Sequence, residues 1–170
     1  MDAAQRQLLD GLLQAIKGER DGQSFYQMAA NSTKDPKAKE VFTQLAAEEL
    51  DHMQFLTQQH ESVLETGRPN QTRRLGPRAD LSGMSPIFSD GIKARIGDAH
   101  HDMSALSIGM QLELDAMKFY KEQAEATKDP VVRSFYSELA EWESGHYAAL
   151  MSQRDELKED YWSANGFSAF

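Results

Sequence analysis

The sequence predicts an all-α fold, a bundle of four helices built from two helical hairpins. Long segments rich in Ala, Leu, Glu, Gln, Lys and Met make up most of the 170 residues, and these residue types favour helices. The triplet Lys-Asp-Pro occurs at residues 34–36 and again at 128–130, in each case as a signal for a helix start. Three of the five prolines fall within residues 66–91, which indicates a long connection between two helical regions.

An internal repeat relates the two regions. Shifting the chain by 94 positions aligns residues 19–56 with residues 113–150 without a gap, and 14 of these 38 positions are identical. Self-similarity of this kind indicates a duplicated structural unit. We therefore expect one domain over residues 1–170 that contains two related hairpins.

The first hairpin is predicted over residues 1–65, with helices at 3–31 and 36–65. Asp35 is placed to cap the second helix, and Pro36 occupies its first turn, where a missing N–H has no cost. Because the break between the helices is short, we expect them to be antiparallel neighbours.

A crossover connection is predicted over residues 66–102, with a short helix near 90–98. An extended chain of about 25 residues reaches about 80 Å, whereas a helix of about 30 residues is about 45 Å long. The connection can therefore run the whole length of a bundle, as in four-helix bundles with one long crossover.

The second hairpin is predicted over residues 103–160, with helices at 103–126 and 130–160. Residues 161–170 form an aromatic tail. Exposed aromatic side chains favour burial, so we expect the tail to dock on a second copy of the chain in a homodimer; a frayed end is the alternative.

The charge and the lack of cysteine limit the function classes. Twenty-seven acidic and 18 basic residues give a formal net charge of −9, which disfavours nucleic acid and anionic membranes as partners because both are bound through Lys and Arg. No apolar run is long enough to span a membrane, and we expect a soluble, cytoplasmic protein. Without Cys, any metal or redox site must use His and carboxylates.

Several polar residues occupy positions where the helix pattern requires apolar side chains. The second helix of each hairpin carries a Glu and a His three residues apart in its core register, and the first helix carries one Glu there. A buried ionised carboxylate is costly without a compensating charge. The six residues are Glu19, Glu49, His52, Glu113, Glu143 and His146.

These six side chains are candidate metal ligands. Residues i and i+3 share one helix face, so each Glu-x-x-His pair can direct both side chains to one point. Oxygen and nitrogen donors in this mixture suit Fe, Mn or Zn, and two divalent cations would balance four carboxylates. One such pair alone is a weak signal, but two pairs in one repeat register predict a dinuclear site. A buried hydrogen-bonded network is the alternative.

At these residues the chain resembles the ferritin-like superfamily and, within it, the diiron domain of rubrerythrins. The resemblance implies a ferritin-like four-helix bundle that binds two iron ions, with Mn or Zn as alternatives. It also implies that Glu49 and Glu143 bridge the two metals. The terminal ligands would then be Glu19 and His52 for one metal, and Glu113 and His146 for the other.

Two tyrosines extend the resemblance. Tyr26 lies seven residues after Glu19 on the same helix face, and Tyr120 lies equivalently after Glu113. Family members carry a tyrosine there that hydrogen-bonds near the metals, so the resemblance implies catalytic roles for both; ordinary aromatic core positions are the alternative.

Two features depart from the family. Full-length rubrerythrins add a Cys-ligated rubredoxin domain that supplies electrons, whereas this chain has no Cys. An external electron-donor protein or a small reductant is therefore expected. The further Glu that rubrerythrins carry one turn after the ligand of the third helix is replaced by Ala116, so we expect a simpler centre of four Glu and two His.

Three functions agree with these residues. The first is a non-haem diiron oxidoreductase that reduces hydrogen peroxide or dioxygen. The second is a ferroxidase or iron-handling protein, in which Fe²⁺ is the substrate. The third is a helical bundle without redox function that binds Zn²⁺, since the same ligands serve all these metals.

The remaining candidates have less support. Asp51 could orient a ligand His, but its repeat mate is Gly145. Glu48 is expected to point off the ligand face, and Trp142 replaces it in the second hairpin. The three histidines outside the core register are expected at the surface: His60, His100 and His101.

Overall fold

The described residues form four helices and no strand. The computed structural model describes the backbone of residues 2–76 and 99–164. The helices are α1 (Ala3–Ser32), α2 (Pro36–Thr66), α4 (Ala99–Ala126) and α5 (Pro130–Ala164). The predicted all-α four-helix fold is thereby confirmed.

The Lys-Asp-Pro triplets begin the second helix of each hairpin, as predicted. Asp35 Oδ1 accepts hydrogen bonds from the backbone N–H groups of Lys37 and Ala38, both at 3.0 Å. Asp129 Oδ1 accepts from Val131 N at 2.8 Å and from Val132 N at 3.3 Å. Each aspartate satisfies two amides that have no partner within the helix, which fixes where α2 and α5 start.

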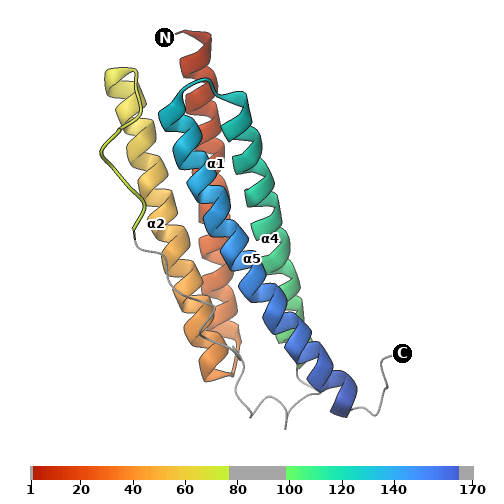
Figure 1. The fold of residues 1–170 in the computed structure, drawn as a ribbon. Helices are drawn as coiled ribbons and strands as arrows, with labels where there is room; N and C mark the ends of the chain where they lie inside the picture. The colour runs from red at the N-terminus through yellow and green to blue at the C-terminus, as the bar shows by residue number, and fades with distance from the viewer. Residues whose placement is uncertain (1, 77–98, 165–170) are drawn as a thin grey trace.

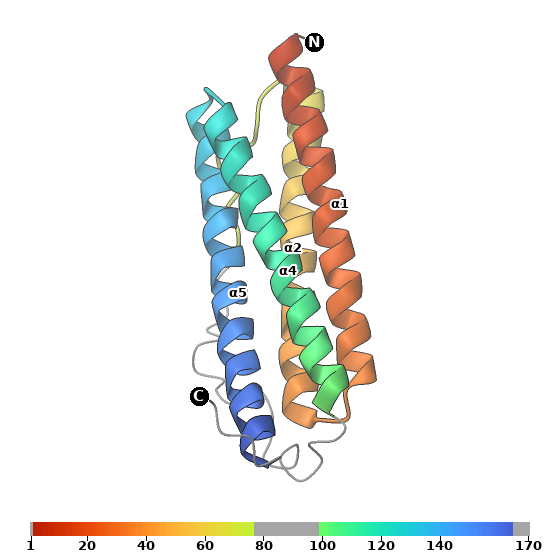
Figure 2. The same ribbon diagram turned by 90° about the vertical axis from the view of Figure 1, so that its right-hand side faces the viewer.

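The helices pair as two antiparallel hairpins (Figure 1). α1 packs along α2, α4 packs along α5, and α1 also contacts α4. Figure 2 shows α1 and α4 on the same side of the bundle. Because α2 ends at one end of the bundle and α4 begins at the other, the connection between them spans its length (Figure 1).

The start of the connection is held against α2. Gly67, with φ +75°, takes the left-handed conformation that ends α2. The side chain of Gln59 binds the backbone of Asn70 twice. Its Oε1 accepts a hydrogen bond from the Asn70 N–H at 2.8 Å, and its Nε2 donates one to the Asn70 carbonyl oxygen at 3.3 Å. Leu75 is buried in the core. The rest of the connection, including the short helix predicted near 90–98, lies outside the described residues.

Two helix ends differ from the predicted ones by more than one residue. α4 begins at Ala99, four residues earlier than expected, because Ala favours helix and the acidic Asp102 favours the first turn. α5 continues to Ala164, into the predicted aromatic tail. The side chains of 161–164 and all of 165–170 lie outside the described residues, and so does the expected docking of the tail.

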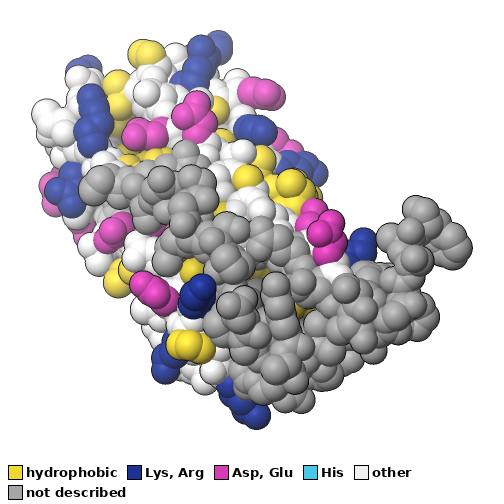
Figure 3. All heavy atoms as spheres, turned by 60° about the horizontal axis from the view of Figure 1, so that its bottom comes forward, with side chains coloured by type: hydrophobic (Ala, Val, Ile, Leu, Met, Phe, Trp, Pro, Cys, Tyr) yellow, Lys and Arg dark blue, Asp and Glu magenta, His cyan; other side chains and the backbone are white. Residues whose placement is uncertain are grey.

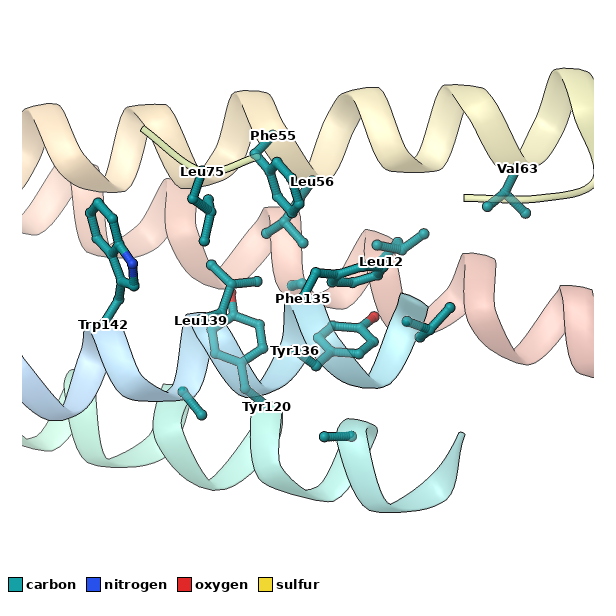
Figure 4. Packing of buried hydrophobic residues seen from close by; sticks show 14 of the residues in the cluster. Leu12, Phe55, Leu56, Val63, Leu75, Tyr120, Phe135, Tyr136, Leu139 and Trp142 are labelled. Atoms are coloured by element: carbon teal, nitrogen blue, oxygen red, sulfur yellow. The ribbon is translucent and has the colours of Figure 1, made fainter. Parts of the chain in front are cut away.

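The hydrophobic core has two parts. One cluster includes Phe42, Leu106 and Leu150. The other, shown in Figure 4, includes Leu56 and Leu139. On every helix the predicted metal ligands fall in sequence between residues of one cluster and residues of the other. The ligands are therefore held in the middle of the bundle by well-packed apolar layers on both sides.

The described surface carries mixed charge. On the face seen in Figure 3, Lys and Arg side chains lie among Asp and Glu side chains. None of the helices in the described part of the chain is both long enough and apolar enough to cross a membrane.

Candidate metal centre

The six predicted ligands meet in the middle of the bundle. α1 and α4 contribute one Glu each, and α2 and α5 contribute a Glu and a His each. All six side chains are buried, with exposed fractions of 1–4%. We call them the Glu/His cluster: Glu19, Glu49, His52, Glu113, Glu143 and His146.

The cluster divides into two overlapping groups of four. In each group one ligand atom per residue can be chosen such that all lie within 4.8 Å of one another. Glu49 and Glu143 belong to both groups and are called the shared carboxylates. Glu19 belongs only to the group that contains His52, and Glu113 belongs only to the group that contains His146. Glu19 and Glu113 are called the terminal carboxylates. Two ions held by these groups would each be offered one terminal carboxylate, one imidazole and two shared carboxylates.

Both imidazoles direct Nδ1 into the cluster. Nδ1 of His52 lies 3.1 Å from Glu143 and 3.4 Å from both Glu19 and Glu49. Nδ1 of His146 lies 3.2 Å from Glu143, 3.6 Å from Glu113 and 3.7 Å from Glu49. The two rings are nearly parallel, with centroids 5.9 Å apart.

Several of these polar atoms have no hydrogen-bond partner among the described residues. They are both nitrogens of His52, both carboxylate oxygens of Glu143 and Nδ1 of His146. The oxygens and nitrogens lie at ion-pair distances but are not aligned as donor and acceptor. Buried polar atoms without partners are costly. Divalent cations placed in the cluster would satisfy all of these atoms except Nε2 of His52, which is not the nitrogen directed at the carboxylates. The donor set therefore fits a metal pair better than a closed hydrogen-bonded network.

The electrostatics of the cluster separate the two kinds of carboxylate. Burial, together with the charges of the shared carboxylates, raises the pKa of Glu19 and Glu113 well above the ordinary value. Burial acts in the same direction on the shared carboxylates. There, contacts with both imidazoles and, for Glu49, with Glu19 prevail and lower the pKa, to about 2 for Glu49.

The two imidazoles also shift. Burial lowers the pKa of a His, but the facing carboxylates outweigh it and raise the pKa of His52 and of His146 well above the ordinary value. Without metal, these raised pKa values favour protons on the imidazoles and on the terminal carboxylates. Metal ions must displace these protons.

Both predicted tyrosines bind carboxylates of the opposite hairpin. The hydroxyl of Tyr26 on α1 donates to Glu113 Oε1 on α4. The hydroxyl of Tyr120 on α4 donates to Glu19 Oε1 on α1. Each terminal carboxylate is thus oriented by a buried tyrosine from the other hairpin. Gly109 allows this approach, since a Cβ there would lie 3.2 Å from the Tyr26 ring and hydroxyl.

Glu48 contacts a member of the cluster, which its expected place off the ligand face of α2 did not predict. Its side chain is buried, and its Oε2 lies 3.0 Å from Nε2 of His146. The expectation considered only the face of α2 that carries Glu49, whereas α5 approaches the neighbouring face. The sequence carries no local signal for this contact, because it depends on how the two hairpins dock.

The other candidates lie away from the cluster. Asp51 is exposed, so it does not orient a buried ligand. His101 is exposed, as expected, whereas His60 is half-buried. The side chain of His100 lies outside the described residues.

A cavity of about 290 Å³ leads from the surface to the cluster between α1 and α4. Its lining includes the four buried glutamates of the cluster, Tyr26 and Tyr120, together with the exposed residues Lys17, Asp21 and Asp115. Small residues of both helices keep this passage open: Ala15, Gly18, Gly22 and Ala116.

Comparison with known proteins agrees with this arrangement. Residues 10–78 match the family model described as Rubrerythrin. The resemblance to a rubrerythrin-type, ferritin-like domain is confirmed over this range, which contains Glu19, Glu49 and His52. The second hairpin is related to it by the 94-residue repeat. Comparisons with curated proteins and with solved structures gave no match.

Proposed function

We propose that this chain is a non-haem diiron oxidoreductase that reduces hydrogen peroxide with electrons from an external donor. The observation that carries the proposal is the pair of overlapping ligand groups that share Glu49 and Glu143. Shared carboxylates suit two ions held close together, and the rubrerythrin match over the first hairpin supports iron as the metal.

The bound metal would supply the electrons. The Glu/His cluster would hold two ferrous ions, which together would supply the two electrons needed to cleave the O–O bond of a peroxide. The carboxylates of the chain can shift between coordination modes, so they tolerate the change in metal charge that accompanies this step.

The residues around the cluster would supply access, orientation and protons. The cavity between α1 and α4 admits a small oxidant to the carboxylate side of the site. Reduction of peroxide to two waters consumes two protons as well as two electrons. Tyr26 and Tyr120 line this cavity, and the hydroxyl of each donates a hydrogen bond to a terminal carboxylate. We propose that they orient these carboxylates and donate protons during the reaction.

The electrons must come from outside the chain. The chain has no Cys and therefore no thiolate-bound iron centre that could pass electrons to the cluster. We propose that a separate donor protein or a small reductant restores the ferrous state between turnovers.

The test combines metal loading with rapid oxidation. Anaerobic addition of Fe²⁺ should load two ions per chain, and mixing with hydrogen peroxide should oxidise them faster than mixing with dioxygen. Glu49→Ala combined with Glu143→Ala should abolish loading. Asp51→Ala should leave it unchanged, because Asp51 is an exposed acidic residue of the same helix.

Other outcomes would point to the other functions. Uptake of many iron ions per chain would indicate an iron-handling protein. Isolation of the protein with two Zn²⁺ and no reaction of the iron-loaded form with either oxidant would indicate a bundle without redox function. Unchanged metal binding in the Glu49→Ala, Glu143→Ala variant would refute the assignment of the site.

A further inference from the structure

The repeat gives the cluster an approximate twofold symmetry, which one pair of residues breaks. Tyr26 and Tyr120 make the same contact in opposite hairpins. Glu48 and Trp142 also occupy equivalent positions, each one turn before the ligand His of its own hairpin. Each of these two side chains contacts the His of the other hairpin, but one is a carboxylate and the other an indole.

Glu48 holds His146 with a charged acceptor. Its Oε2 lies 3.0 Å from His146 Nε2, and its Oε1 accepts a hydrogen bond from Gln44 Nε2 at 3.1 Å. With both oxygens engaged and only 4% of the residue exposed, the carboxylate is fixed in place. A proton on Nε2 donated to Glu48 leaves Nδ1 as the ligand atom, and Nδ1 is the nitrogen that faces the cluster.

His52 has no such acceptor. Its Nε2 is buried and has no hydrogen-bond partner among the described residues. Trp142 reaches from α5 toward α2 (Figure 4), and the two rings meet edge to face, with centroids 4.9 Å apart and planes at 77°. Packing therefore limits the position of the His52 ring, but within the described part of the chain no carboxylate lies at its Nε2 to fix the tautomer.

We propose that Glu48 is a positioning residue for His146 and that the two metal positions consequently differ, with the ion at His146 bound more tightly than the ion at His52. This inference depends on the proposed metal site. The physical reason is that a carboxylate behind a ligand imidazole fixes its tautomer and orientation and makes the ligand nitrogen more basic. Loss of such a partner typically costs about 10- to 100-fold in metal affinity.

Titration with Co²⁺ under anaerobic conditions tests the proposal, because its visible absorption reports each binding step without oxidation of the metal. The wild-type chain should bind two ions in two resolved steps. Glu48→Leu should weaken the tighter step about 10- to 100-fold and change the weaker step by less than about threefold. Glu48→Gln, which can still accept the hydrogen bond from Nε2, should restore most of the affinity. Asp51→Leu is the matched control, an exposed acidic residue of α2, and should change neither step.

A double-mutant cycle assigns the effect to His146 and separates positioning from a general loss of structure. Glu48→Leu should lose its effect in a His146→Ala background and keep it in a His52→Ala background. An equal weakening of both steps, or the same effect in both backgrounds, would overturn the proposal while leaving the metal site intact. If the wild-type chain binds no Co²⁺, the proposed function fails and this inference fails with it.

Discussion

Three buried tyrosines allow a sharp test of the hydrogen bonds around the cluster. Tyr26, Tyr120 and Tyr136 are each at most 1% exposed. The first two donate to the terminal carboxylates, whereas the hydroxyl of Tyr136 has no hydrogen-bond partner among the described residues. Replacing each by Phe removes the same oxygen from three similar positions, two with an acceptor and one without.

The expected effects follow from these contacts. A hydrogen bond contributes about 1 kcal/mol between neutral groups and about 1.5–3 kcal/mol to a charged group. Because the raised pKa of Glu19 and Glu113 favours their neutral form over the charged one, both values apply, and we expect Tyr26→Phe and Tyr120→Phe each to lower the free energy of unfolding by about 1–3 kcal/mol. Tyr136→Phe removes a buried polar atom without a partner and should leave stability unchanged or raise it by up to about 1 kcal/mol.

Urea unfolding of chelator-treated protein measures these differences. With a slope of about 2 kcal/mol per molar urea, a loss of about 2 kcal/mol lowers the midpoint by about 1 M. The slope should stay the same in all three variants if the folded and unfolded states keep their compactness. Equal destabilisation by Tyr136→Phe and Tyr26→Phe would show that the carboxylate contacts do not stabilise the fold, and our reasoning would be wrong.

Three further predictions concern the metal, the protons and the glycines. At free Co²⁺ about 100-fold above Kd, each bound ion should stabilise the fold by about 2.7 kcal/mol, and thermal unfolding that is the same with cation and with chelator would contradict this. Because the pKa of both imidazoles and both terminal carboxylates is raised, Co²⁺ affinity should increase from about pH 6 to about pH 8 with release of protons. Over the same range the metal-free protein should lose stability. The protons on the imidazoles stabilise the fold fully below the ordinary pKa of 6.5, and this contribution is lost as the pH rises through the pKa values of the folded state. Calorimetry in two buffers measures the released protons, and a Co²⁺ affinity and a metal-free stability that both stay constant with pH would refute the assignment. Gly109→Ala should destabilise the fold by about 1–3 kcal/mol through overpacking against Tyr26, offset by about 0.5–1 kcal/mol from the higher helix propensity of Ala. Gly18→Ala, where a Cβ would have nothing within 4 Å, should show only the gain in helix propensity. Equal changes of the two variants in urea unfolding would contradict the packing at Tyr26.

Local patterns accounted for most of the fold. The Lys-Asp-Pro triplets placed the starts of α2 and α5 correctly because an Asp cap and a Pro in the first turn act on backbone groups within a few residues. The prediction was less accurate at Ala99 and at the end of α5, where the sequence has no comparable stop or start signal. Helix ends without a cap signal depend on weak propensities and on packing.

The six members of the Glu/His cluster could be identified from the sequence by itself, because a residue in the core register of a helix faces the inside of the bundle whether it is polar or apolar. The repeat made this argument stronger, since it requires the same inward positions in both hairpins. That they bind iron remains a proposal, because the same donors serve several metals.

The contacts between hairpins were decided only by the tertiary structure. Neighbouring residues on a helix point about 100° apart, so Glu48 is off the face of Glu49 and yet faces α5, where His146 lies 3.0 Å away. The crossing of the two tyrosines to opposite carboxylates and the cavity between α1 and α4 are likewise set by how the hairpins dock. The sequence determined which residues lie inside each helix pair, because periodicity is a local property. Which residue of one pair meets which residue of the other depends on the rotation and offset between helices, and no local pattern in the chain encodes them.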